Sequence, residues 1–191
     1  MTISQTITIV SGLPRSGTSL MMQVLDRGGM EVVTDNIRTA DEDNPRGYYE
    51  FEKVKKIKED SSWLKATRGK VFKMVSMLLY DLPLNEKYQI IFMQRDMDEA
   101  LASQRKMLKR LNQAAGPDDD EMGELLTVHL NKIYNWLEQQ NIDVLYVSYN
   151  DLVTDTLKGV EEVKGFLGTN LDIEKMAEVI DKSLYRNRGE I

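Results

Sequence analysis

The sequence predicts an α/β fold in which helices cover both faces of a mostly parallel central sheet. Short apolar segments rich in β-branched residues alternate with helical patterns along the whole chain, as in successive right-handed strand–helix–strand units. The first of these segments runs directly into a glycine-containing turn that opens a helix. No linker-like stretch divides the 191 residues, so we expect one domain over residues 1–191.

Each element has its own signal in the sequence. Residues 6–11 (TITIVS) are typical of a buried strand, and the next helical pattern begins at Thr18 and stops at the glycine pair 28–29. The acidic run 118–121 suits a helix N-terminus, and Asp172 suits the cap of a last short helix. Further strands are expected at residues 31–33, 71–79 (a strand, or a strand that leads into a loop), 88–95 and 143–149, and further helices at 50–66, 97–113, 122–140 and 153–168.

The composition limits the classes of partner. The formal charge is −6, so a general attraction to nucleic acid or to an anionic membrane is not expected. The chain has no cysteine, which excludes disulfides, thiolate nucleophiles and zinc–thiolate sites and fits a reducing cytoplasm. The apolar N-terminal stretch lacks a preceding basic region, and no segment approaches the roughly 18 apolar residues that a membrane span needs. We therefore expect a cytoplasmic protein.

The turn after the first strand has the features of a phosphate-binding loop. Residues Gly12 to Ser19 have the spacing G-x-x-x-x-G-T-S, one residue away from the nucleotide triphosphatase loop G-x-x-x-x-G-K-[ST]. Backbone amides of residues 16–20 and the helix dipole would attract an anion there, and Arg15 would add a cation. This makes the predicted fold a P-loop-type, three-layer α/β/α architecture. Thr18 replaces the lysine that reaches the terminal phosphates, which argues against a triphosphate with Mg²⁺.

The same loop, LPRSGTSL, resembles the 5′-phosphosulfate loop of sulfotransferases, P-[KR]-S-G-T-[ST]. The resemblance implies that the protein binds 3′-phosphoadenosine 5′-phosphosulfate as its co-substrate and uses no metal. A sulfuryl group carries one negative charge where a terminal phosphoryl carries about two, so metal clamping is not required. On this reading the loop residues that hold the donor are Pro14, Arg15, Ser16, Gly17, Thr18 and Ser19.

Two further segments resemble the nucleotide-binding parts of that family. Arg95 ends the strand IIFMQ, and Ser103 follows eight residues later on the next helix, as in the family's 3′-phosphate site. The segment VLYVSYNDL is similar to a family segment in which the tyrosine, here Tyr149, lies against the adenine. In each case the alternative is a structural role: a surface charge, a solvent-facing serine or a half-buried aromatic residue.

The catalytic segment both matches and departs from the family. In many cytosolic sulfotransferases a strand carries K-T-H; here Lys73 holds the lysine position and Val75 the histidine position. We expect Lys73 and Arg15 to stabilise the leaving oxygen, while the family's usual base is missing. The tail SLYRNRGEI weakly resembles a segment that closes over the 3′-phosphate, through Arg186 and Arg188 here, or is a solvated basic tail.

A carboxylate is the remaining candidate for the base. The segment DEDNPRGYYEFEKV resembles the acceptor-side loop of bacterial sulfotransferase-like proteins and offers Glu50, with Asp35 and Glu52 as second choices. The alternative role of Glu50 is that of a helix-capping carboxylate. The single histidine, His129, lies within a helical pattern, and we expect it to be structural.

The sequence therefore predicts a sulfotransferase that moves a sulfuryl group from 3′-phosphoadenosine 5′-phosphosulfate to a hydroxyl or amine acceptor. Two alternatives stay open: a kinase or nucleotide triphosphatase with a degenerate loop, and a nucleotide-binding protein without catalysis. The acceptor cannot be identified from the sequence. Because the chain is short for this family, its acceptor site is expected to be open or to be completed by a second copy in a homo-oligomer.

Overall fold

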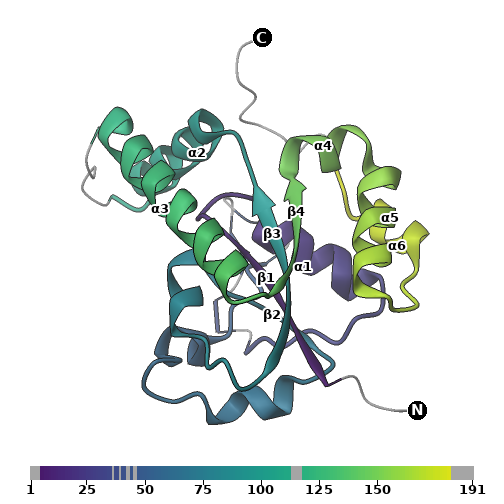
Figure 1. The fold of residues 1–191 in the computed structure, drawn as a ribbon. Helices are drawn as coiled ribbons and strands as arrows, with labels where there is room; N and C mark the ends of the chain where they lie inside the picture. Colours follow the sequence, from purple (N-terminus) through teal and green to yellow (C-terminus); the bar gives the residue numbers. More distant parts are fainter. Residues whose placement is uncertain are drawn as a thin grey trace.

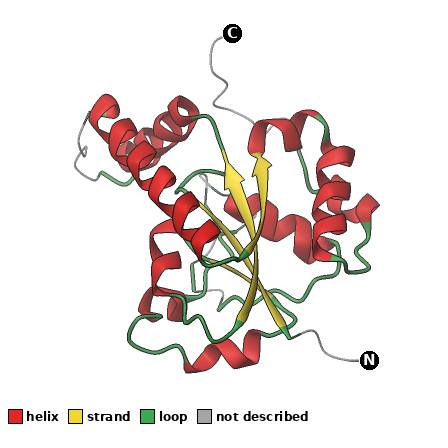
Figure 2. Cartoon of the chain, in the orientation of Figure 1, coloured by secondary structure: helices red, strands yellow, loops and turns green. Residues whose placement is uncertain are grey.

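The structure is built on a single sheet of four parallel strands (Figures 1 and 2). The computed structural model describes residues 5–35, 37–38, 40–41, 44, 47–112 and 118–181. The strand order is β2-β1-β3-β4, with all three pairings parallel, which confirms the predicted α/β class. The strands are β1 (Thr6–Gly12), β2 (Val71–Lys73), β3 (Lys87–Gln94) and β4 (Asp143–Ser148).

Successive residues of the strands point to opposite faces of the sheet, so the sheet separates two hydrophobic cores. On one face, Val10 and Ile91 pack in a cluster with the first helix and with the helices after β4. On the other, Ile9 and Phe92 pack in a second cluster with the segments around residues 51–82 and the helix before β4. The result is three layers with the sheet in the middle.

The helices divide between the two faces as Figure 1 shows. The first face carries α1 (Thr18–Arg27), α4 (Tyr149–Thr154), α5 (Thr156–Leu167) and α6 (Ile173–Glu178). The second face carries α3 (Asp119–Gln139) and three 3₁₀ helices, η1 (Glu52–Lys56), η2 (Ser62–Thr67) and η3 (Ser76–Asp81). Helix α2 (Met97–Arg110) follows β3 at the carboxyl edge of the sheet and lies beside α3.

Several helix ends form as the sequence predicts. The Asp118 side chain accepts a hydrogen bond from the Glu121 amide, and the Asp172 side chain accepts one from the Lys175 amide. Each therefore caps the N-terminus of its helix by satisfying an amide that has no partner within the helix. Among the described helices, none combines the length and the apolar character that a membrane crossing requires.

Two predicted elements before β2 are wrong. Residues 31–33 do not form a strand of the sheet; Val32 makes only an isolated parallel bridge to Val71, the first residue of the short strand β2. The expected helix over 50–66 is instead η1 and η2. The apolar residues that pack against the sheet there, the half-buried Phe51 and the buried Val54 and Ile57, recur every three residues, which is the repeat of a 3₁₀ helix.

Two predictions later in the chain need correction as well. The expected strand over 143–149 ends at Ser148, whose side chain accepts a hydrogen bond from the Asp151 amide and so starts α4 at Tyr149. The expected helix over 153–168 is divided at Asp155 into the end of α4 and the whole of α5. The segment 71–79 is a short strand that passes through a loop into η3. Tyr149 therefore faces the site from a helix N-terminus and not from a strand end.

Candidate functional site

The loop between β1 and α1 holds its two glycines, and also Arg15 at φ 68°, at positive φ. Gly12 has φ 150° and Gly17 has φ 96°, in the region that favours glycine. A Cβ on Gly12 would lie 2.5 Å from Ser16 Oγ and 2.6 Å from the Met93 carbonyl oxygen. A Cβ on Gly17 would lie 2.4 Å from the ring of Tyr149. Both predicted loop glycines are therefore required by close neighbours as well as by conformation.

The loop presents the N-terminus of α1 to a cavity. The helix begins at Thr18, and the Met21 amide makes the first main-chain bond back, to the Gly17 carbonyl. The amides of residues 18–20 precede that bond and have no acceptor within the helix. The Ser16 amide differs from the prediction, because it donates to the Leu13 carbonyl at 3.2 Å. The candidate anion site therefore comprises the amides of residues 18–20 and the helix dipole. The Ser16 Oγ is buried beside Gly12, has no hydrogen-bond partner among the described residues and does not line the cavity.

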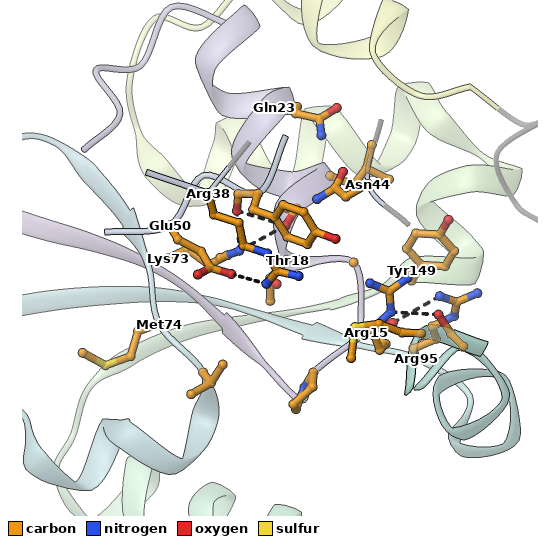
Figure 3. A pocket seen from close by; sticks show the side chains of 18 of the residues that line it. Arg15, Thr18, Gln23, Arg38, Asn44, Glu50, Lys73, Met74, Arg95 and Tyr149 are labelled. Atoms are coloured by element: carbon orange, nitrogen blue, oxygen red, sulfur yellow. Dashed lines mark hydrogen bonds and ion pairs between the residues drawn. The ribbon is translucent and has the colours of Figure 1, made fainter. Parts of the chain in front are cut away.

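The predicted pair Arg95 and Ser103 meets this loop. Arg15 Nε donates to Ser103 Oγ at 2.8 Å, and Arg95 Nη1 donates to the Arg15 carbonyl at 3.1 Å. Arg95 also forms an ion pair with Glu99 at 3.1 Å, and Glu99 accepts a hydrogen bond from Asn150 at 3.2 Å. These contacts join the loop, the end of β3 and the second turn of α2 into one cluster (Figure 3).

Tyr149 completes this end of the site. The guanidinium carbon of Arg95 lies 4.4 Å from the centroid of the Tyr149 ring, and the ring packs against Gly17. This is a cation–π contact in a largely desolvated place. Burial raises the pKa of the Tyr149 hydroxyl above its ordinary value, so the ring stays neutral. The residues that the sequence analysis linked to the two phosphates and to the adenine ring, namely the loop, Arg95, Ser103 and Tyr149, therefore lie together.

Lys73 lies on the other side of the loop. Its ammonium donates to Ser19 Oγ at 3.1 Å and to the Tyr48 carbonyl, and Ser19 Oγ also donates to that carbonyl at 3.2 Å. Burial lowers the pKa of Lys73 to about 8, against the opposing effect of Glu50. The nearby Lys70 instead forms an ion pair with Glu31 at 2.6 Å and does not line the cavity.

Glu50 reaches the cavity but is held by two cations. It forms ion pairs with Arg38 at 2.8 Å and with Lys55 at 3.5 Å, and its side chain is 18% exposed. Arg38 in turn lies 3.4 Å from the centroid of the Tyr48 ring. Asp35 accepts a hydrogen bond from the Glu52 amide at 2.6 Å and thereby caps η1. Neither Asp35 nor Glu52 lines the cavity, so Glu50 is the candidate that the fold places in reach.

His129 does not line this cavity. Its Nε2 lies 2.8 Å from Ser76 Oγ, and its ring packs edge-on against Tyr80, at a centroid distance of 6.1 Å. It lines a separate surface hollow between α3 and η3, and burial lowers its pKa. Val75, in the position of the family histidine, does line the main cavity, and 39% of it is exposed there.

The cavity has a volume of about 550 Å³ and two ends of different character. One end is the polar cluster around the loop. The other end is apolar, borders the second hydrophobic cluster, and is lined by Phe51, Val54, Met74, Val75 and Leu78. Several lining residues were missed by the sequence analysis. Among the polar ones are Arg38, which lies in a loop without a recognisable pattern, and Gln23, whose signal was a single polar residue in the buried run LMMQVL.

Two further findings concern the predicted C-terminal arginines and the residues that could hold a metal ion. Arg186 and Arg188 lie outside the described residues, so their predicted contact with the 3′-phosphate stays a prediction. Within the described part of the chain, no group of three or more histidine, aspartate or glutamate residues is arranged to hold a metal ion.

The comparisons with known proteins agree with this geometry. The sequence model of the sulfotransferase domain matches residues 5–188. A search of curated protein sequences finds no significant match. Among solved structures, the sulfotransferase domain of an olefin synthase from Synechococcus PCC 7002 superposes with a TM-score of 0.57 at 16% identity, covering 100% of this chain and 82% of that one.

Two other structures share the fold. Mouse sulfotransferase SULT7A1, solved in complex with PAP, gives a TM-score of 0.55 at 18% identity; the alignment covers 92% of this chain but only 63% of the mouse protein. The sulfotransferase domain from the curacin biosynthetic pathway gives 0.55 at 16% identity, covering 96% of this chain and 90% of that one. At such identities the structures show the fold, and the match of the domain model over nearly the whole sequence shows the family: the chain belongs to the sulfotransferase domain family.

Proposed function

We propose that this protein transfers a sulfuryl group from 3′-phosphoadenosine 5′-phosphosulfate to a hydroxyl or amine acceptor. The observation that carries the proposal is that one cavity joins two anion-binding clusters. The helix N-terminus at Thr18 supplies one, and Arg95 with Ser103 supplies the other, with Arg15 in contact with both. A nucleotide with charged groups at its 5′ and 3′ positions fits such a pair of clusters.

The donor-binding roles follow from the chemistry of the groups. The 5′-phosphosulfate would accept hydrogen bonds from the amides of residues 18–20, from the Thr18 hydroxyl, and from the Ser19 hydroxyl once that group turns away from the Tyr48 carbonyl. The 3′-phosphate would lie at Arg95 and Ser103. Because the Ser103 oxygen already accepts from Arg15, its own proton can be donated to a phosphate oxygen.

The transfer step uses the cations between the two ends of the cavity. A lone pair of the acceptor oxygen or nitrogen forms the new bond to sulfur, the bond from sulfur to the bridging phosphate oxygen breaks, and its electron pair leaves with adenosine 3′,5′-bisphosphate. Lys73 and Arg15 would stabilise the negative charge that develops on the leaving oxygen. Lys73 is placed for this role because its ammonium already contacts Ser19 of the donor loop.

The proton of the acceptor needs a destination. We assign it to Glu50, which lines the cavity, while Val75 cannot accept a proton. Glu50 is paired with Arg38 and Lys55, so it would exchange its contact with Arg38 for the acceptor hydroxyl. The apolar end of the cavity, around Val75 and Leu78, is where we place the body of the acceptor.

The proposed donor is tested by ligand-induced stabilisation. The melting temperature would be measured with adenosine 3′,5′-bisphosphate and with ATP, each with and without Mg²⁺. We expect stabilisation by the bisphosphate that does not depend on Mg²⁺ and that is weakened in Ser103→Ala. Ser62→Ala, at the start of η2 and not among the residues that line the cavity, is the matched control.

The outcomes separate three kinds of protein. Stabilisation by ATP with Mg²⁺ alone would overturn the proposal in favour of a kinase or nucleotide triphosphatase. Stabilisation by the bisphosphate without transfer of labelled sulfate to any of a panel of alcohols, phenols and amines would indicate a nucleotide-binding protein without catalysis. Stabilisation together with transfer would support the proposal.

A further inference from the structure

We propose that Gln23 reads the base of the bound nucleotide, by hydrogen bonding to the edge of adenine that carries its amino group. The proposal rests on the proposed function, which brings an adenine nucleotide into the cavity. It adds a specificity-determining residue that lies outside the phosphate-binding loop, on the second turn of α1.

The burial of Gln23 calls for a hydrogen-bond partner. In the middle of α1, Met21, Met22, Val24 and Leu25 are fully buried, and Gln23 is the one polar residue among them, at 5% exposed. Its Oε1 is buried and accepts no hydrogen bond from any described residue. Buried polar atoms without partners are rare in folded proteins because no hydrogen bond compensates for the free-energy cost of removing them from water. An apolar residue would suit the core better, so the amide is explained by a partner that the chain itself does not supply.

The position of Gln23 places that partner in the cavity. Gln23 lines the cavity together with Ser19 and Leu20, which precede it by one helical turn on the same face of α1. Tyr149 and Val153 line it from α4, on the same side of the sheet. Figure 3 shows Gln23 well away from Met74, which belongs to the apolar end.

This separation decides between the two molecules that the reaction requires. The acceptor belongs at the apolar end, next to Val75 and Lys73. A nucleotide whose phosphates lie at the loop and at Arg95 has its base in the remaining space, between α1 and α4. Leu20 and Val153 offer apolar contacts to the faces of a planar ring there, and Gln23 meets its edge.

A primary amide is complementary to the amino edge of adenine. The amide has one acceptor oxygen and two N–H donors, and adenine presents an amino donor beside a ring-nitrogen acceptor. A half-turn of the Gln23 amide about its last bond exchanges oxygen and nitrogen without displacing the rest of the side chain. Either polar atom can therefore face the cavity, and both can bond the same base edge.

The test compares two nucleotides that differ in the amino group alone. Dissociation constants would be measured by calorimetry for adenosine 3′,5′-bisphosphate and for purine riboside 3′,5′-bisphosphate, which lacks the 6-amino group. We expect the wild-type protein to prefer the adenosine compound about tenfold, because the purine leaves the amide oxygen unpaired. In Gln23→Met, the binding of adenosine 3′,5′-bisphosphate should weaken until the two dissociation constants are about equal.

Two controls distinguish base reading from a structural role. The free Gln23→Met protein should melt at or above the temperature of the wild type, because the variant replaces a buried unpartnered amide by an apolar side chain of similar length. Gln104 lines the same cavity from α2 and likewise has a buried Oε1 without a partner among the described residues. Gln104→Met should keep the tenfold preference. Gln23→Leu is the second variant if Gln23→Met does not fold.

Each result decides something. Equal affinity of the wild type for the two nucleotides overturns the role of Gln23 and leaves the proposed donor intact. Retention of the preference in Gln23→Met, an equal weakening of both nucleotides, or loss of the preference in Gln104→Met overturns it as well. Failure of the wild type to bind either nucleotide means that the proposed function has failed, and the role of Gln23 fails with it.

Discussion

Replacement of Lys73, whose charged ammonium is buried, is the most informative single substitution. Burial lowers the pKa of Lys73 from its ordinary value of 10.5 to about 8. Because one pH unit of difference corresponds to about 1.4 kcal/mol, holding this charge in the folded protein at pH 7 costs about 3 kcal/mol. The hydrogen bonds from Lys73 to Ser19 and to the Tyr48 carbonyl offset part of this free-energy cost, by about 1 kcal/mol each.

Lys73→Met should therefore stabilise the protein while it removes activity. We expect the free energy of unfolding at pH 7 to rise by about 1 kcal/mol, measured by urea denaturation. The kcat/KM for sulfuryl transfer should fall by about 10²–10³-fold, as when a donor that stabilises a developing anion is removed. A variant that is less stable than the wild type at pH 7, or that keeps its activity, would refute the reasoning.

The same charge predicts a pH dependence with a definite sign. Between pH 8 and pH 10.5 the lysine is protonated in the unfolded chain but largely neutral in the folded one. Stability rises with pH wherever the unfolded state binds more protons, so the penalty of about 3 kcal/mol is present below pH 8 and disappears across this window. The difference in unfolding free energy between the wild type and Lys73→Met should therefore shift in favour of the wild type as pH rises. A difference that does not change with pH would contradict the assigned burial.

Three further substitutions test separate contacts. Gly17→Ala should lose about 3 kcal/mol or more of unfolding free energy and all nucleotide binding, because its Cβ would lie 2.4 Å from the ring of Tyr149. The control is Gly29→Ala: Gly29 has φ 99° but no atom within 4 Å of an added Cβ, so this variant should lose only the conformational part, about 1–2 kcal/mol. Thermal unfolding compares the two variants. Glu50→Gln should lower kcat about 10²–10⁴-fold with little change in donor affinity, while Glu52→Gln should leave kcat within about twofold; equal effects in steady-state kinetics would remove Glu50 from the reaction. Arg95→Met should lose about 3–5 kcal/mol of unfolding free energy, because it leaves a buried carboxylate without its cation at 3.1 Å; a loss below about 1 kcal/mol in urea titration would show that the pair is not buried in solution.

The sequence predicted the parts of the site that depend on local motifs. The strand–loop–helix at Gly12 to Ser19 forms as expected because its glycines, hydroxyls and helix start are encoded within one short segment. Arg95 and Ser103 were expected to lie near one anion because a strand end and the second turn of the following helix have a predictable spacing; both residues contact Arg15, and their binding of an anion stays a prediction. Their direct contact with Arg15 depends on how β1 and β3 pair, which no local pattern contains.

The errors arose where tertiary packing outweighs local pattern. The helix expected over 50–66 rested on charge and apolar periodicity, but Val54, Ile57 and Trp63 instead anchor two short 3₁₀ helices to the sheet. Arg38 lines the cavity but has no signal in the sequence. The pairing of Glu50 with Arg38 and Lys55 was therefore invisible from the sequence, although it governs whether Glu50 can accept a proton.

The central claim is that one nucleotide spans the two anion-binding clusters of a single cavity. A crystal structure of the protein with adenosine 3′,5′-bisphosphate tests it most directly. We predict the 5′-phosphate on the amides of residues 18–20 and the 3′-phosphate within hydrogen-bonding distance of Arg95 and Ser103. A bisphosphate bound elsewhere, or bound with both phosphates away from Arg95 and Ser103, would contradict the account.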